Sequence, residues 1–277
     1  MNKRTLVGLA LLFLLFVAPL AMEAGPLKFR IFGGGDYLQG GDLNRGLQGW
    51  TDYWKANYNA QGYTQQTGSF NPINLGLNIG GDVILLLSPH WGLGLGTEYI
   101  MATKSSALTF QSATKEITWD ILGKVQAMPA KLSLFYFIPV KDSLTIIFHA
   151  GTGYYSAKTR LESRSDIEYI IDANATGVGF HGGLGLEMKL FTGVHFFVEG
   201  AGRYAALSGF KGKTTITGDG SWDGTLYYWE AKHNYIDNYG YIDLVGGPPS
   251  GAAVKFVREA KIDFSGFSLR AEISIRI

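Results

Sequence analysis

The chain has 277 residues, with 24 basic and 23 acidic side chains, 38 glycines, 8 prolines and no cysteine. The lack of cysteine excludes disulfides, thiolate metal sites and a lipid-anchored N-terminal cysteine. The balanced charge argues against nucleic acid or a generally anionic surface as a partner. Abundant glycine with little proline favours tightly packed strands over a disordered linker.

Residues 1–24 are predicted to be an export signal that is cleaved, leaving 25–277 as one mature domain. A basic start precedes the apolar run from Leu6 to Met22, and Ala24 is the preferred cleavage residue. An uncleaved membrane anchor is the alternative, although the run is short for a span of about 20 residues. The mature chain has no comparable apolar run, so no transmembrane helix is expected in it.

Alternation of apolar residues with polar or small ones predicts strands along the whole mature chain. The pattern begins over 27–37 and is clearest over 73–87, where every second residue from Ile73 to Leu87 is apolar apart from Gly81. It returns over about 91–101, 128–138, 144–154, 178–190, 194–203 and 267–277. Short turn signals at 88–90, 139–142 and 191–193 lie about fifty residues apart, so each interval is expected to hold two strands with a longer loop at the far end.

Eight strands with both chain ends on one side predict an all-β fold, a transmembrane antiparallel up-and-down β-barrel with long extracellular loops at 39–71 and 207–257. A soluble lipocalin-like barrel is the alternative, with its apolar face turned inward. Aromatic residues at both strand ends favour the membrane form, because membrane interfaces select such belts. The predicted belts are Trp91, Tyr136, Phe191 and Phe196 at the short turns, and Tyr99, Tyr154, Tyr155 and Tyr204 at the long loops.

Three segments resemble the small eight-stranded outer-membrane β-barrel family: AGTGYY from Ala150, GFHGGLGLEMKL from Gly179, and the closing SGFSLRAEISIRI. The resemblance covers nearly the whole mature chain. It implies a bacterial outer-membrane location among lipid and lipopolysaccharide, and insertion machinery that recognises the C-terminal strand. Family members usually end in an aromatic residue, whereas this chain ends in Ile277.

Charged residues on the inward face of the predicted strands form the first candidate site. An eight-stranded barrel is just wide enough for its own side chains, so these charges are expected to pair with one another. Either they form a structural plug, or the pairs rearrange and open a narrow conduit. The predicted network comprises Glu98, Lys131, Glu187, Lys189, Glu199, Arg203, Arg270, Glu272 and Arg276.

Aromatic residues in the two long loops form the second candidate site. Leu43, Leu47, Trp50 and Trp54 have the spacing of one helical face, so the first loop is expected to hold a short helix that serves as a lid or presents aromatic rings to a ligand. The last loop is longer than a connection requires, and long loops on a rigid scaffold often bind ligands. The candidate contacts are Trp50, Trp54, Trp222, Tyr227, Tyr228 and Trp229.

Other motifs give weak signals, and no cofactor, metal or catalytic residue is predicted. The GxGxxG spacing from Gly177 to Gly182 lies within an alternating strand, where a dinucleotide site is not expected. The aspartates of the last loop lack the spacing of a calcium loop. His149 and His181, with Glu187, suggest a lipid-modifying enzyme only weakly, because no nucleophile is placed to face the lipid.

The sequence therefore predicts a non-enzymatic outer-membrane barrel, a structural anchor whose surface loops mediate binding or adhesion. A narrow channel for small or hydrophobic solutes is the alternative. No ligand or solute is identified by the sequence.

Overall fold

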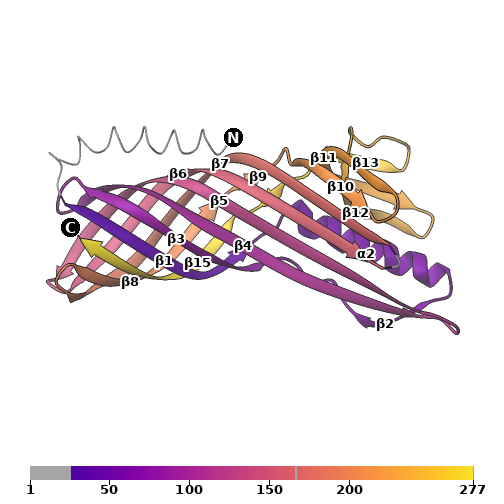
Figure 1. Cartoon of the computed structure of the whole chain (residues 1–277), viewed down its shortest axis with the longest axis horizontal. Helices are drawn as coiled ribbons and strands as arrows, with labels where there is room; N and C mark the ends of the chain where they lie inside the picture. Colours follow the sequence, from indigo (N-terminus) through magenta and orange to yellow (C-terminus); the bar gives the residue numbers. More distant parts are fainter. Residues whose placement is uncertain (1–25, 166, 277) are drawn as a thin grey trace.

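The computed structural model describes residues 26–165 and 167–276, so the predicted signal lies outside the described residues. Eight strands form the ring of the barrel, whose arrangement is shown in Figure 1. They are β1 (Leu27–Leu38), β3 (Leu75–Leu86), β4 (Trp91–Gln111), β5 (Glu116–Lys141), β6 (Leu144–Arg164), β7 (Glu168–Phe191), β8 (Val194–Tyr204) and β15 (Gly266–Arg276).

Antiparallel pairing closes these strands into a ring. Each strand pairs with its neighbours in chain order, and β15 joins β8 to β1, from Arg276 opposite Lys28 to Gly266 opposite Leu38. The turns that join β3 to β4, β5 to β6 and β7 to β8 all lie at the left end in Figure 1, and they are the short turns predicted at 88–90, 139–142 and 191–193. A closed ring satisfies the strand hydrogen bonds without a free edge, which is what a hydrocarbon environment requires. The predicted fold is thus confirmed.

The remaining elements form a head at the other end of the barrel. They are α2 (Asp42–Ala60), β2 (Thr64–Gly68), β9 (Ala206–Leu207), β10 (Lys211–Ile216), β11 (Gly220–His233), β12 (Ile236–Val245), β13 (Val254–Glu259) and β14 (Ile262–Asp263). No helix in the described part of the chain is long and apolar enough to cross a membrane.

Four strands extend far beyond the predicted bounds. β4 continues to Gln111, β5 begins at Glu116, β6 continues to Arg164 and β7 begins at Glu168. The loops expected at the far ends of these hairpins are therefore wrong, because only tight turns remain there. The predicted loop 207–257 is also largely strand. Its β10 pairs with residues 169–174 of β7, at the end away from the short turns, which we call the upper end. β11 and β12 continue that sheet.

The apolar face changes sides partway along the four longest strands, β4 to β7. In β5 the outward residues from Met128 to Ile138 are mostly apolar, and the inward residues include Lys131 and Ser133. Farther up, the outward residues are polar, such as Lys124, and the inward ones are apolar. The lower section has about the 9–11 residues that a tilted strand needs to cross a bilayer. The upper section has the pattern of a water-exposed sheet with an apolar core.

Aromatic side chains mark both limits of this outward apolar band. Trp91 contacts Tyr136 at the short-turn end, with ring centroids 4.7 Å apart. At the other limit Tyr154 and Tyr204 are exposed. Tyr155 was predicted to join this belt, but it is fully buried because it lies on the inward side of β6.

The predicted helix of the first loop is confirmed as α2. Its buried face includes Leu43, Leu47 and Trp50 and packs against β12 in the head. Its first residue, Asp42, accepts a hydrogen bond from the backbone N–H of Lys261 (3.0 Å) and pairs with Arg258 (2.6 Å). These contacts fix the start of the helix to the segment that leads into β15.

Candidate functional site

Seven of the nine predicted inward charges are buried inside the barrel: Glu98, Lys131, Glu187, Glu199, Arg203, Arg270 and Glu272. Lys189 and Arg276 are not part of this network. Both are exposed near the short-turn end, because β7 and β15 reach the water there and their inward positions are no longer enclosed.

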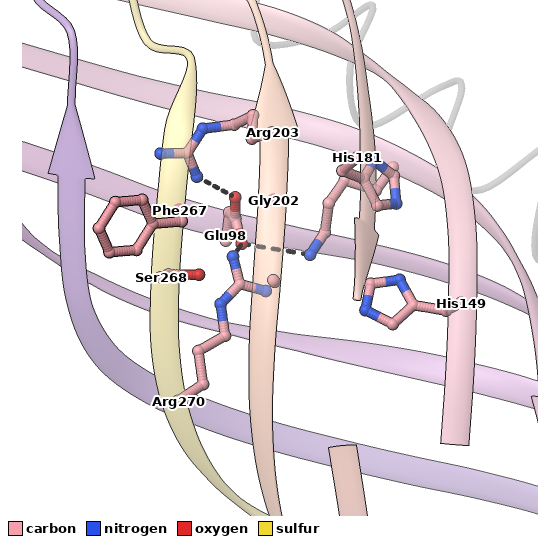
Figure 2. A pocket seen from close by; sticks show the side chains of 10 residues that line it. Glu98, His149, His181, Gly202, Arg203, Phe267, Ser268 and Arg270 are labelled. Atoms are coloured by element: carbon pink, nitrogen blue, oxygen red, sulfur yellow. Dashed lines mark hydrogen bonds and ion pairs between the residues drawn. The ribbon is translucent and has the colours of Figure 1, made fainter. Parts of the chain in front are cut away.

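Glu98 is the centre of one half of the network (Figure 2). Its carboxylate lies 2.8 Å from Arg270, 3.2 Å from Arg203 and 3.3 Å from Lys131. These partners come from β15, β8 and β5, so a single carboxylate from β4 links strands on several sides of the ring.

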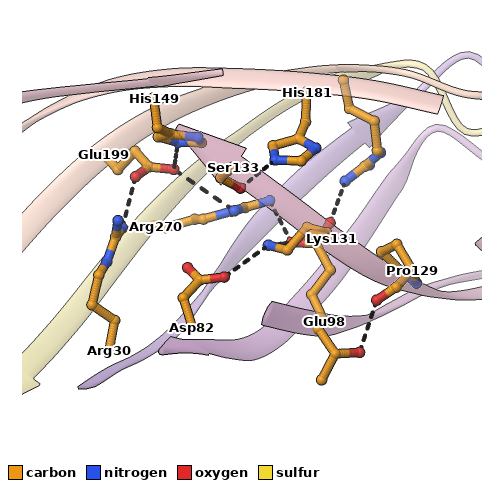
Figure 3. A network of polar contacts seen from close by, with 12 residues as sticks. Arg30, Asp82, Glu98, Pro129, Lys131, Ser133, His149, His181, Glu199 and Arg270 are labelled. Carbon is orange, nitrogen blue, oxygen red and sulfur yellow. Dashed lines mark hydrogen bonds and ion pairs between the residues drawn. The ribbon is translucent and has the colours of Figure 1, made fainter. Parts of the chain in front are cut away.

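Glu199 is the centre of the other half (Figure 3). Its oxygens lie 2.9 Å from Arg30, 3.0 Å from the imidazole of His149 and 3.7 Å from Arg270. Arg30 also donates to Glu272, with Nε 2.7 Å from Oε2. Arg270 contacts both Glu98 and Glu199 and so joins the two halves.

Four members of the network were missed at the sequence level. Lys28 pairs with Glu187, Arg30 with Glu199 and Glu272, Asp36 with Arg203 (3.4 Å) and Asp82 with Lys131 (3.7 Å). The signal that identifies them is present in the sequence. Each lies on the polar side of the alternation in the first or second strand, as the predicted members do in later strands.

The two lumen histidines lie beside a very small cavity. His149 and His181 have ring centroids 5.8 Å apart, and Nε2 of His181 shares a 2.8 Å hydrogen bond with Ser133 Oγ. Glu187, the third suggested member, pairs with Lys28 instead. The cavity holds about 10 Å³, the space of about one water molecule. A lipid acyl chain does not fit there.

Apolar side chains lie among the charges near the short turns and above the charges in the head. The lower cluster comprises Ile84, Leu86, Phe135, Phe137, Ile147 and Phe197. The upper one is the core of the head and includes Leu43, Leu47 and Trp50. The lower cluster contacts the charges directly, since the Arg30 guanidinium lies 4.7 Å from the centre of Phe197. Charged and apolar side chains together thus fill the barrel.

The head carries an open cleft of about 510 Å³, which we call the aromatic cleft. It lies between the C-terminal half of α2, β11, β12 and the loop after β12. Its lining residues are Tyr53, Trp54, Trp229, Tyr239, Tyr241, Asp243, Val245, Gly247 and Pro249.

Asp243 is the one acidic side chain among these lining residues. Its Oδ1 accepts hydrogen bonds from the Tyr169 hydroxyl and from the backbone N–H of Leu244 (2.6 Å). Burial raises the pKa of this carboxyl to about 6, against the opposing effect of the two hydrogen bonds. The cleft therefore contains a carboxyl group with one oxygen held by the protein.

The predicted loop contacts are divided between core and surface. Trp54 and Trp229 line the aromatic cleft. Tyr227 is half-buried, and Trp222 is exposed and donates from Nε1 to the carbonyl of Leu244 (3.0 Å).

Trp50 and Tyr228 are not available at the surface, and their prediction as contacts is wrong. Trp50 is buried against Tyr169 and Tyr241, because it lies on the face of α2 that packs on the head. Tyr228 is buried beneath the guanidinium of Arg258.

Tyr53, Tyr239, Tyr241 and Asp243 are the cleft residues that sequence reasoning missed. Alternation over 239–245 places Tyr239, Tyr241 and Asp243 on one face of a strand, which was a usable signal. Their proximity to Tyr53 is not visible in the sequence, since 185 residues separate Tyr53 from Tyr239.

The GxGxxG spacing of Gly177–Gly182 lies inside β7. No group of three potential metal ligands was found within the described ranges.

No protein-family model and no curated protein sequence matches the chain. Several solved structures are similar at 10% sequence identity. The outer membrane protease OmpT from Escherichia coli has a TM-score of 0.46, with 92% of this chain and 97% of that chain covered. The outer membrane protein OprG from Pseudomonas aeruginosa has a TM-score of 0.38, with 90% and 95% covered. Ail, the attachment invasion locus protein of Yersinia pestis, has a TM-score of 0.33, with 91% and 99% covered. At these scores the assignment of the fold rests on the strand ring described above.

Proposed function

We propose that this protein is a bacterial outer-membrane barrel that binds a ligand at the cell surface through the aromatic cleft, without catalysing a reaction. The observation that carries the proposal is the contrast between the two ends of the structure. The lumen is filled by charged and apolar side chains around a cavity of about 10 Å³, whereas the head opens a cleft of about 510 Å³. The barrel then serves as the anchor and the head as the binding site.

The outward surface of the barrel supports the membrane location. The lower section is apolar, with Leu132, Leu134 and Leu184 among its exposed residues. In water such a surface would be far larger than the apolar patches that soluble proteins tolerate. The soluble alternative requires this face to point inward, whereas the inward residues of the lower section include the buried charges Lys131, Glu199 and Arg270 as well as apolar rings.

Lipopolysaccharide is the proposed lipid partner above this band. Lys158 lies between Gln126 and Asn174 in the ladder, and Lys211 follows Asn174. Two residues farther from the short turns, the strand pairing places Lys124 of β5 beside Arg160 of β6. Arg160 pairs in turn with Asp172 of β7, and Asp172 with Lys213 of β10. These outward amines suit the phosphates of the outer leaflet. Replacing Lys158 and Lys211 by glutamate should lower the lipopolysaccharide that copurifies with the barrel, and an unchanged amount would contradict this part of the proposal.

Single-channel conductance separates this function from the channel alternative. The refolded mature protein should be silent in a planar bilayer, with folding verified by heat-dependent gel mobility. A reproducible conductance that changes in Glu199→Gln or Arg203→Gln would overturn the proposal, because it would make the lumen the functional site.

Accessibility of the cleft tests the other half of the proposal. The chain has no cysteine, so Pro249→Cys introduces a single thiol at the rim of the cleft. A membrane-impermeant maleimide should label this thiol on intact cells. Failure to label it in a protein shown to be folded would contradict a surface-binding role.

A further inference from the structure

We infer that the aromatic cleft binds sugar rings of an oligosaccharide, a ligand class that rests on the proposed surface-binding function. The inference depends on three features of the cleft: the arrangement of its rings, its polar groups and its size.

The rings form a continuous surface. Tyr53 stacks on Tyr239 with centroids 5.3 Å apart and planes at 23°, and Tyr239 meets Tyr241 at 6.1 Å. Tyr241 in turn contacts Trp229 at 4.8 Å. This chain of contacts joins α2, β12 and β11 into one aromatic wall. The C–H faces of a sugar ring are apolar and pack against such a wall.

The same arrangement argues against a quaternary ammonium ligand. A cation of that kind is held in a cage of rings around a vacant centre. Here the rings contact one another directly, so the space that a caged cation needs is filled by their own neighbours.

The polar groups of the cleft match ligand hydroxyls. The Tyr169 hydroxyl and the Leu244 N–H both bond to Oδ1 of Asp243. Among the described residues none donates to Oδ2, which is left to accept a hydrogen bond from a ligand. Sugar hydroxyls are donors as well as acceptors, so they suit both this oxygen and the tyrosine hydroxyls at the wall.

The size of the cleft indicates a short oligosaccharide. Its volume of about 510 Å³ falls within the range of about 300–1,000 Å³ that is usual for pockets holding drug-sized ligands. A wall made of rings from three elements extends beyond the area that one sugar covers. The ligand is therefore several linked sugars, with at least one ring against Trp229 or Tyr239.

Calorimetric titration of the whole mature protein in detergent micelles tests this inference. The probes are maltotetraose, cellotetraose and chitotetraose, with choline chloride as the cationic probe. At least one tetrasaccharide should bind, and choline should not. Trp229→Ala and Tyr239→Ala should each weaken binding about tenfold, the loss expected for one well-packed aromatic contact. Tyr235→Ala is the matched control, because Tyr235 is exposed in the β11–β12 turn and does not line the cleft.

The possible results of the titration test the ligand class separately from the proposed surface-binding function. No binding of any tetrasaccharide, or binding that the two cleft variants leave unchanged, would overturn the sugar assignment. Choline binding that those variants abolish would replace it with a cation. In either case a silent lumen and a labelled Pro249→Cys would leave the proposed surface-binding function in place.

A protection measurement covers the case in which the alanine variants do not fold. Labelling of Pro249→Cys by maleimide should slow in the presence of the tetrasaccharide that binds. An equal rate with and without each of the three tetrasaccharides would also overturn the sugar assignment.

Discussion

Glu98 shows how single residues hold the barrel shut. Its carboxylate is buried and shared by Lys131, Arg203 and Arg270. A buried charge is costly when it is unpaired, so each of these side chains depends on the others. The network is therefore stable as a set and sensitive to the loss of any one member.

We expect Glu98→Gln to lower the free energy of unfolding by about 3–5 kcal/mol, the usual effect of removing one partner from a buried ion pair. Urea unfolding in detergent micelles, followed by tryptophan fluorescence, measures the change. Glu116→Gln, an exposed residue at the start of β5, should change stability by no more than about 0.5 kcal/mol. Equal unfolding midpoints for the two variants would contradict the role of Glu98.

Asp243 should make the head more stable at low pH. Its folded-state pKa of about 6 lies above the ordinary value of 3.8, so the folded state holds the proton more tightly than the unfolded state does. The stabilisation is complete below about pH 4 and is lost as the pH rises through 6. Burial also raises the pKa values of Tyr169 and Tyr241, so these neighbours stay neutral over this range.

The measurement for Asp243 is the thermal unfolding midpoint at pH 4.5 and at pH 7.5. Relative to Asp243→Asn, the free energy of unfolding of the wild-type protein should be higher by about 1–3 kcal/mol at pH 4.5 than at pH 7.5. Each tenfold difference in proton affinity between the folded and unfolded states is worth about 1.4 kcal/mol. A difference between the two proteins that does not vary with pH would show that this carboxyl does not titrate as expected.

At the scale of elements, period-two alternation predicts the positions of all eight barrel strands but not their lengths. In β5 the apolar residues occupy the even positions from Met128 to Ile138 and the odd positions from Trp119 to Ala127. The strand is continuous, but its apolar face changes sides where it leaves the membrane. A search for one apolar face therefore stops at this boundary and predicts loops where the upper strands continue.

The aromatic cleft was beyond prediction for a different reason. It brings residues of α2 together with residues of β11 and β12, and six of the eight barrel strands lie between these elements in the sequence. The inward charges, by contrast, follow from local alternation. Sequence reasoning found most of them and missed those on the first two strands, where the same rule was not applied.

The close packing of α2 on β12 requires glycine at the point of contact. A Cβ atom at Gly49 would lie 1.7 Å from the carbonyl oxygen of Gly240, and that oxygen belongs to the backbone and has little room to move. The helix and the strand can therefore approach this closely only because residue 49 has no side chain.

We expect Gly49→Ala to destabilise the head by about 1–3 kcal/mol, because overpacking outweighs the better helix propensity of alanine. Loss of near-ultraviolet circular dichroism from the aromatic wall should accompany the change. Gln48→Ala, the adjacent exposed position, is the control and should be close to neutral. A Gly49→Ala protein as stable as the wild type would mean that α2 does not rest on β12 at this point.

At the scale of the whole molecule, the reversal of the apolar face defines where the membrane ends. Below the reversal the outside is apolar and the inside holds buried charges among apolar rings. Above the reversal the outside is mostly polar and the inside apolar. Four of the eight strands, β4 to β7, thus belong both to the membrane barrel and to the base of the water-exposed head. This arrangement places α2, β11 and β12, whose residues line the aromatic cleft, at the end opposite the short turns (Figure 1).

Single-cysteine labelling on intact cells tests this placement, because the natural chain offers no competing thiol. Lys158→Cys, outward and above the reversal, should react with an impermeant maleimide. Leu132→Cys, in the apolar band, should not react while the barrel is folded in lipid. Asp142→Cys, in a short turn, should react only after the outer membrane is permeabilised, since short turns face the periplasm. Labelling of Asp142→Cys on intact cells would invert the orientation and place the aromatic cleft in the periplasm, where a cell-surface ligand could not reach it.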